Sequence, residues 1–265
     1  MNARRFLVLS TACLFALIGS QADLVLNESF SNPSSIKSHL LSWRDEPKSW
    51  KLDNGKLEIE PDPETDYWQK TYYKPEIRKA RGAQLGLWLE EGDVVLETAF
   101  TLRPVNRFDQ AGVLIRASDT HWVKAGIEFS DGAPRLSVVL TSGASTWSVQ
   151  PWEYDRGGEG LVSLALRLYR IGDDIVVEAR HGPSEDDHWD LFAIGRVEGI
   201  GSRVFAGLSA LAPTTNRKQA GSVSFDYLRI WRCPSVGSCY HHTAQEGGEH
   251  DGNIMDLQLG HSKEF

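Results

Sequence analysis

The hydrophobic positions between residues 24 and 232 repeat every second residue. In residues 164–169, for example, three leucines alternate with Ala165, Arg167 and Tyr169, as expected for a strand that buries one face. Turn sequences such as Asn54-Gly55 and Asp131-Gly132 separate runs of this kind. We therefore predict about a dozen short strands in a β-sandwich or barrel, with no long helix. The predicted strands cover residues 50–52, 56–59, 84–89, 94–102, 111–117, 122–129, 134–141, 164–169, 175–179, 189–197, 204–210 and 223–231.

Composition and charge argue against some classes of function. The 265-residue chain is 41% hydrophobic and 24% charged and carries a net charge of −8. These values are typical of a folded globular protein, and the acidic balance argues against a nucleic-acid partner, which needs a basic surface. No apolar run approaches the ~20 residues of a membrane span. We expect one domain over residues 23–232, without a cofactor.

The N-terminus has the pattern of a secretory signal peptide. Arg4 and Arg5 precede an apolar stretch at residues 6–18, and small residues follow up to Ala22. We predict cleavage after Ala22, which removes residues 1–22 and places the protein in the secretory pathway or outside the cell. An uncleaved anchor, or an apolar stretch that arises by chance, is the alternative. Asn27, in the sequon Asn27-Glu28-Ser29, is then a candidate for glycosylation.

Residues 233–265 differ in composition from the predicted strands. Once Cys13 is removed with the signal peptide, Cys233 and Cys239 remain, and in an oxidising compartment they could close a small disulfide loop. The residues that follow are rich in Gly and acidic side chains, and we expect a flexible tail. Metal binding by the tail histidines is the alternative, although their spacing follows no ligand pattern. These histidines are His241, His242, His250 and His261.

Alternation along residues 122–129 separates two faces of a predicted strand. Trp122, Lys124, Gly126 and Glu128 share one side, and we expect it to form an outward, solvated sheet face. Such a face could be purely structural, or it could bind saccharide, because indole rings stack on sugar rings and polar groups bind hydroxyls. The residues that we expect to line a saccharide groove are Asp66, Trp68, Gln110, Arg116, Trp122, Lys124, Glu128 and Trp147.

Each group in this groove has an expected role. The three tryptophans would stack on sugar rings, and the carboxylates and the amide would bind hydroxyls. Arg116 and Lys124 would orient the carboxylates or bind an acidic sugar. Because these two cations would lower the pKa of Glu128, Glu128 would serve as an anion better than as a general acid.

Three ordered motifs resemble the regulation-of-enolase protein family, a domain of unknown function in the concanavalin A-like lectin/glucanase superfamily. They are TDYWQKT at residues 65–71, DQAGVLIR at 109–116 and HWVKAGIEF at 121–129. The resemblance implies a jelly-roll β-sandwich of two antiparallel sheets, and it brings no established catalytic residues.

These observations favour a non-catalytic, lectin-like protein whose partner is an oligo- or polysaccharide. A polysaccharide hydrolase or lyase, with Glu128 as acid or base, is one alternative, although the sequence contains no G-x-S-x-G, HExxH or P-loop motif. A protein-interaction regulator of carbohydrate metabolism, with an unknown protein partner, is the other.

Overall fold

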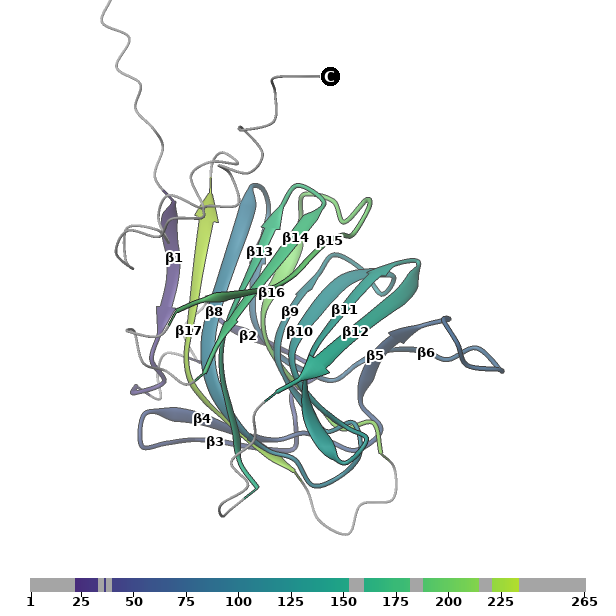
Figure 1. Cartoon of the computed structure of the whole chain (residues 1–265). Helices are drawn as coiled ribbons and strands as arrows, with labels where there is room; N and C mark the ends of the chain where they lie inside the picture. The colour runs from purple at the N-terminus through teal and green to yellow at the C-terminus, as the bar shows by residue number, and fades with distance from the viewer. Residues whose placement is uncertain are drawn as a thin grey trace, which may run out of the picture.

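The computed structural model describes residues 22–32, 36, 40–152, 160–181, 188–214 and 221–233. Every regular element in these ranges is a β-strand, as Figure 1 shows. The strands form two large antiparallel sheets and one separate hairpin, which confirms the predicted all-β sandwich. Within the same ranges, no helix has the length and apolar character needed to cross a membrane.

The first large sheet is called the β8 sheet, after one of its central strands. Its strand order is β15-β14-β13-β8-β17-β4-β3, and β1 pairs with the C-terminal half of β17. Its strands are β1 (Asp23–Glu28), β3 (Ser49–Asp53), β4 (Lys56–Glu60), β8 (Asp93–Arg103), β13 (Val162–Ile171), β14 (Asp174–Arg180), β15 (Asp190–Arg196) and β17 (Ser222–Cys233).

The second large sheet is called the β10 sheet. Its strand order is β12-β11-β10-β9-β16-β7-β2. Its strands are β2 (Ser42–Arg44), β7 (Ala83–Leu89), β9 (Gln110–Arg116), β10 (His121–Ser130), β11 (Ala133–Ser142), β12 (Ala144–Pro151) and β16 (Val204–Leu211).

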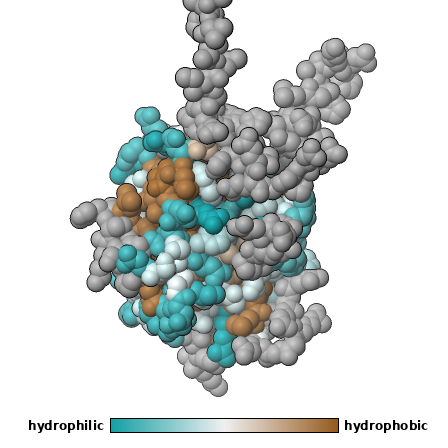
Figure 2. Space-filling model, turned by 90° about the vertical axis from the view of Figure 1, so that its left-hand side faces the viewer, coloured by the Kyte–Doolittle hydropathy of each residue, from teal (hydrophilic) through white to brown (hydrophobic). Residues whose placement is uncertain are grey.

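The core lies between the inner faces of the two sheets. Leu96 and Phe100 of the β8 sheet, and Val113 and Val123 of the β10 sheet, belong to one continuous cluster of buried aliphatic and aromatic residues. Because side chains alternate along a strand, the residues between them point outward. The outward side of the β10 sheet therefore carries Lys124 and its polar neighbours, as predicted. Figure 2 shows the molecule from the side on which β1 lies, where hydrophilic residues predominate and hydrophobic ones form separate patches.

Tight turns occur where the sequence predicts them. Asn54 and Gly55 both have positive φ, at 51° and 74°, in the turn between β3 and β4. Asp131 and Gly132, in the turn between β10 and β11, also have positive φ, at 52° and 76°. Two consecutive positive φ values fit the right-handed twist of a hairpin, and Asn, Asp and Gly adopt them at low cost.

A two-stranded hairpin stands apart from both sheets. It consists of β5 (Asp66–Gln69) and β6 (Arg78–Arg81), which pair antiparallel. Tyr67 of this hairpin is fully buried and packs in one cluster with Trp122 and Leu114, two outward residues of the β10 sheet. The hairpin therefore covers part of the outward side of that sheet.

Candidate functional site

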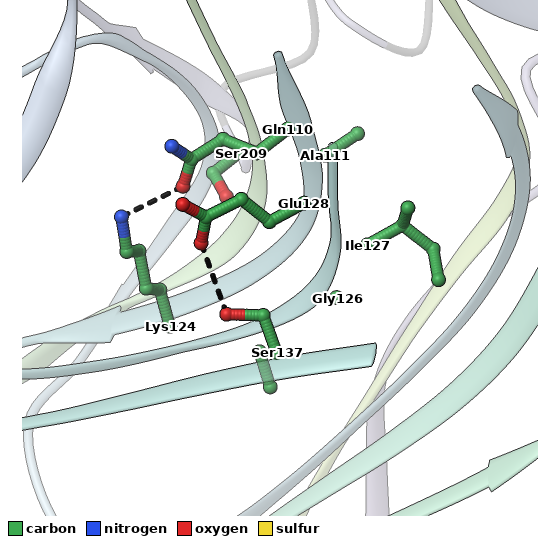
Figure 3. A pocket seen from close by; sticks show the side chains of 9 residues that line it. Gln110, Ala111, Lys124, Gly126, Ile127, Glu128, Ser137 and Ser209 are labelled. Carbon is green, nitrogen blue, oxygen red and sulfur yellow. Dashed lines mark hydrogen bonds between the residues drawn. The ribbon is translucent and has the colours of Figure 1, made fainter. Parts of the chain in front are cut away.

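The register of β9 and β10 brings three of the predicted residues together. Gln110 pairs with Glu128 and Gly112 with Gly126, so that polar side chains surround a pair of glycines. Gln110, Lys124 and Glu128 line a cavity of about 20 Å³, as Figure 3 shows. Ser137 from β11 and Ser209 from β16 also line this cavity, which we call the Glu128 pocket. Its volume is enough for about one water molecule or one ligand hydroxyl.

Two glycines make room for this pocket. A Cβ atom on Gly112 would lie 2.0 Å from the carbonyl oxygen of Ala125, and one on Gly126 would lie 2.0 Å from that of Ala111. Since these obstacles are backbone atoms, no side chain fits at either position without moving a strand. The closely approaching glycines leave a bare stretch of sheet between the side chains of the pocket.

Lys124 connects the pocket to the hairpin. Its Nζ donates a hydrogen bond of 2.7 Å to Gln110 Oε1, and it donates a second of 3.2 Å to Asp66 Oδ1. The Lys124 side chain is 8% exposed and that of Asp66 is 18% exposed. A buried ammonium ion needs such partners, because burial removes its hydration. Asp66 and Gln110 therefore hold Lys124 in one position at the edge of the pocket.

Glu128 is a buried carboxyl group on the same side of β10. Ser137 Oγ donates to Glu128 Oε2 at 3.0 Å, and Trp147 Nε1 donates to Ser137 Oγ at 3.0 Å. Burial raises the pKa of Glu128 above its ordinary value, and the attraction of Lys124 only partly offsets this effect. The expected net lowering of the Glu128 pKa is thus wrong: Lys124 does lower this pKa, but the cost of desolvation is the largest contribution and raises it.

The raised pKa of Glu128 predicts a pH-dependent stability. The unfolded chain releases this proton near the ordinary glutamate pKa, whereas the folded chain retains it to higher pH. The contribution of Glu128 to folding is therefore intact below the ordinary pKa and is lost as the pH rises toward the raised value. We expect the free energy of unfolding of wild type, relative to Glu128→Gln, to fall by about 1.4 kcal/mol per pH unit in this window.

Urea unfolding of both proteins between pH 4 and 8 measures this difference. Glu90→Gln is the matched control, because the Glu90 side chain is 69% exposed. Its curve should run parallel to that of wild type. Parallel curves for wild type and Glu128→Gln would contradict the raised pKa.

The hairpin covers two of the predicted groove residues. Trp122 is 0% exposed and meets Tyr67 edge-on, with ring centroids 5.7 Å apart. Arg116 is 6% exposed, and its Nη1 donates to the Tyr67 hydroxyl at 3.2 Å and to the Ala80 carbonyl at 3.4 Å. The prediction that Trp122 stacks on a sugar ring is wrong, because no part of its ring is accessible. Arg116 likewise binds the hairpin, and it does not line the Glu128 pocket.

The outward side of the β10 sheet is therefore not the solvated face that we expected. Gln110, Lys124 and Glu128 are all buried. The hairpin and long side chains cover a face that strand alternation alone assigns to solvent. Burying charged groups of this kind costs free energy on folding. Such groups are more frequent at binding and catalytic sites than elsewhere in a protein interior.

The two remaining tryptophans lie at the margin of this region. Trp147, on edge strand β12, is 39% exposed, and it is hydrogen-bonded to Ser137, which lines the pocket. Trp68, on β5, is partly buried, and its Nε1 donates to the carbonyl of Thr71 at 2.9 Å. Its ring meets Tyr73 edge-on. Sugar stacking by Trp68 and Trp147 stays a prediction.

Two residues near the pocket, Ser209 and Gln84, were not among the predicted site residues. Ser209 lies opposite Gly112 on β9 and opposite Gln84 on β7. Gln84 is fully buried; its Nε2 donates to the Leu114 carbonyl at 3.2 Å, while its Oε1 has no hydrogen-bond partner among the residues that the structure describes. The pairing of β16 between β7 and β9 reveals this group, because Ser209 and Gln84 both lie outside the three motifs and are far apart in the sequence. An unpartnered buried acceptor is a place where a ligand hydroxyl or a water molecule can donate.

Other predicted features lie partly outside the described residues. Cys233 is disulfide-bonded, whereas Cys13 and Cys239 are not described, so the pairing of Cys233 with Cys239 stays a prediction. Asn27 is exposed on β1, and its glycosylation is likewise untested. The signal-peptide residues 1–21 and the tail histidines also lie outside the described ranges. Within those ranges, no three His, Cys, Asp or Glu side chains are placed to hold a metal ion.

Most of the chain matches one known protein family. The family described as "Protein of unknown function (DUF1349)" matches residues 43–233. The chain belongs to this family. The DUF1349 match covers both large sheets apart from β1, together with the hairpin and the Glu128 pocket.

Individual relatives agree with this assignment. "Regulation of enolase protein 1" of Saccharomyces cerevisiae is 41% identical over 113 residues, which cover 40% of this chain and 52% of the relative. This confirms the resemblance to the regulation-of-enolase family. The chain spans about half the length of the curated relatives that it matches.

Solved structures confirm the sandwich. A functionally unknown protein from Saccharomyces cerevisiae is 27% identical, with a TM-score of 0.61 over 72% of this chain and 95% of that one. The GH43 BlXynB protein from Bacillus licheniformis has a TM-score of 0.56 at 14% identity, over 77% of this chain and 38% of that one. At such low identity the second likeness shows a common fold alone. The DUF1349 chain is thus a concanavalin-like β-sandwich.

Proposed function

We propose that this DUF1349 protein binds a saccharide, without cleaving it, at the Glu128 pocket. The observation that carries the proposal is the buried polar group of Gln110, Lys124 and Glu128 around a bare glycine floor. A sugar hydroxyl both donates and accepts, so it matches a site that offers an ammonium ion, a carboxyl group and an amide side by side.

The margin of the pocket supports the same proposal. Trp147 is attached to the pocket by a hydrogen bond through Ser137, and more than a third of its side chain is accessible. An accessible indole beside a polar pocket suits a sugar ring, whose C–H groups stack on the ring while its hydroxyls bind the polar groups. The small pocket volume favours one hydroxyl or one terminal ring substituent of the ligand, with the remainder of the sugar lying across Trp147.

The proposed setting is the secretory pathway or the cell exterior. The signal-peptide pattern of residues 1–22 supports it, and so does the participation of Cys233 in a disulfide, since disulfides persist in oxidising compartments. An oligo- or polysaccharide is a partner commonly met in that setting.

A glycan array of the purified full-length protein tests the proposal. We expect selective binding that Trp147→Ala weakens about tenfold or more, because the substitution removes the stacking surface. Trp88→Ala is the matched control. Trp88 is 37% exposed and lies on β7 of the same sheet, with its side chain packed against Phe205. Its substitution should leave binding unchanged.

Two outcomes would contradict saccharide binding at this pocket. One is the absence of any bound glycan with folded protein, which would favour a protein partner, as the name of the yeast relative suggests. The other is an equal loss of affinity in Trp147→Ala and Trp88→Ala, which would place the ligand elsewhere.

Glycoside hydrolysis is a second candidate function. The observation in its favour is the raised pKa of Glu128, a property that a general acid needs, with Asp66 close enough to contribute to that shift. Incubation with the glycans retained on the array, followed by assay of released reducing ends, tests it. Release that Glu128→Gln abolishes would establish hydrolysis; intact glycans would leave binding as the function.

A further inference from the structure

A second buried charge cluster lies on the outward side of the β8 sheet. Glu97 on β8 is 1% exposed and lies between Arg167 on β13 and Arg229 on β17. Its Oε2 accepts a hydrogen bond of 2.5 Å from Arg167 Nε, and its Oε1 accepts bonds from the Tyr227 hydroxyl at 2.9 Å and from Arg229 Nη1 at 3.3 Å. Glu97 is therefore fully engaged by its neighbours.

A third arginine in the cluster has no such partner. Arg180, the last residue of β14, is 6% exposed, and none of its nitrogen atoms is hydrogen-bonded to a described residue. Its described polar contact is with Trp189, whose ring centroid lies 4.4 Å from Arg180 Cζ. Arg167 lies 4.2 Å from the same ring. Two guanidinium groups thus share one indole, and of the two only Arg167 has a carboxylate partner in the part of the chain that the structure describes.

The charges of the cluster do not balance. Among the described residues, three guanidinium groups, on Arg167, Arg180 and Arg229, lie near two carboxyl groups, those of Glu97 and Glu178. Glu178 accepts a hydrogen bond of 2.9 Å from the Tyr169 hydroxyl, and burial raises its pKa above the ordinary value. A buried cation without a counter-ion is costly, and contact with an aromatic ring compensates only part of that cost.

We propose that the outward side of the β8 sheet holds a binding site for a small oxyanion, a carboxylate or a phosphate group, at Arg180. The guanidinium fork matches the spacing of two oxygen atoms in either group, and this geometry gives strong, directional hydrogen bonds. The Trp189 indole N–H also has no hydrogen-bond partner among the described residues, and it supplies another donor beside Arg180. The bound oxyanion provides the negative charge that the cluster lacks.

This site is independent of the Glu128 pocket. Arg180 lies on β14 of the β8 sheet and Trp189 directly precedes β15, whereas Glu128 lies on the outward side of the β10 sheet, beyond the core. Failure of the glycan array would therefore leave the oxyanion site untouched, and the reverse also holds.

Thermal unfolding of the full-length protein tests the site. The probes are sodium phosphate and sodium glucuronate, each compared with sodium chloride at equal ionic strength. We expect at least one oxyanion to raise the Tm of wild type by roughly 5 to 10 °C at about a hundred times its dissociation constant. A shift with phosphate alone indicates a phosphate ligand, and a shift with glucuronate alone indicates a sugar carboxylate.

Two arginine variants separate the site from general ion effects. Arg180→Gln should abolish the shift. Arg203→Gln should retain it, because Arg203 also lies over an indole, 4.2 Å from the Trp88 ring, but is exposed and paired with Glu90. The absence of a shift in wild type, or an equal shift in Arg180→Gln, would overturn the proposal. If Arg180→Gln does not fold, Arg180→Lys replaces it; calorimetry should then show at least fivefold weaker binding, and unchanged binding would overturn the site.

Discussion

Replacing Trp122 by alanine will lower the free energy of unfolding by about 3–5 kcal/mol. The indole is completely buried between the β10 sheet and the hairpin, and its Nε1 donates to the Asp119 carbonyl at 3.2 Å. The substitution removes a large apolar surface and leaves a cavity beneath Tyr67, which then loses its edge-on partner. Urea unfolding, followed by far-UV circular dichroism, measures the change.

The control for this prediction is the accessible tryptophan of the same sheet. Trp88→Ala should cost about 1 kcal/mol, because 37% of the Trp88 side chain already contacts solvent. If the two variants lose similar stability, the hairpin does not pack over Trp122, and the role of Trp122 as a groove residue would be open again. A large loss for Trp122→Ala also means that reduced sugar binding by that variant is not evidence of contact with a sugar.

Alternation and turn chemistry predict the large strands well. Strands β3, β4, β7–β11, β13–β15, β16 and β17 all overlap predicted ones, and the inward side of β10 is the expected one, with Val123, Ala125 and Ile127 in the core. Period-two patterning arises because one face of each strand packs on the other sheet. This alternation depends only on residues within one strand, so it can be recognised in the sequence.

Strands β1, β2, β5, β6 and β12 were not predicted, and β5, β6 and β12 are strands that this condition does not govern. Edge strand β12 is almost entirely exposed, so it has no buried face to mark. The β5–β6 hairpin is short and packs on the outward side of a sheet, where its buried residues are Tyr67 and Gln69. A polar or amphipathic residue that is buried by a distant segment has no periodic signature.

The candidate site was predictable only in part, for the same reason. Gln110, Lys124 and Glu128 were found because they share one side of two strands that are adjacent in the chain. Trp122 and Arg116 share that side too, but the hairpin covers them, and nothing in their own strand indicates this. The sequence therefore identifies the side of the sheet, and tertiary packing decides which part of that side stays open to a ligand.

Replacing Glu97 by alanine will destabilise the protein by about 3–5 kcal/mol, the second large effect that we expect. The substitution leaves Arg167 buried without a counter-ion and removes the acceptor for Tyr227 and Arg229. Glu90→Ala is the matched control. The Glu90–Arg203 pair is 69% and 58% exposed at its two side chains, so breaking it should cost no more than about 1 kcal/mol. Equal losses in the two variants would contradict the buried role of Glu97.

The Glu97 result also bears on Arg180, which lies in the same cluster but makes none of its hydrogen bonds. In buffer without oxyanions, Arg180→Gln should change stability by about 1 kcal/mol or less, because the substitution breaks no hydrogen bond to a described residue and removes a buried charge that no described carboxylate pairs with. A loss as large as that of Glu97→Ala would mean that Arg180 is part of the ion-paired network and is not available to a ligand. A small loss, together with a Tm shift that requires Arg180, would mean that this part of the cluster serves binding, while Glu97 serves folding.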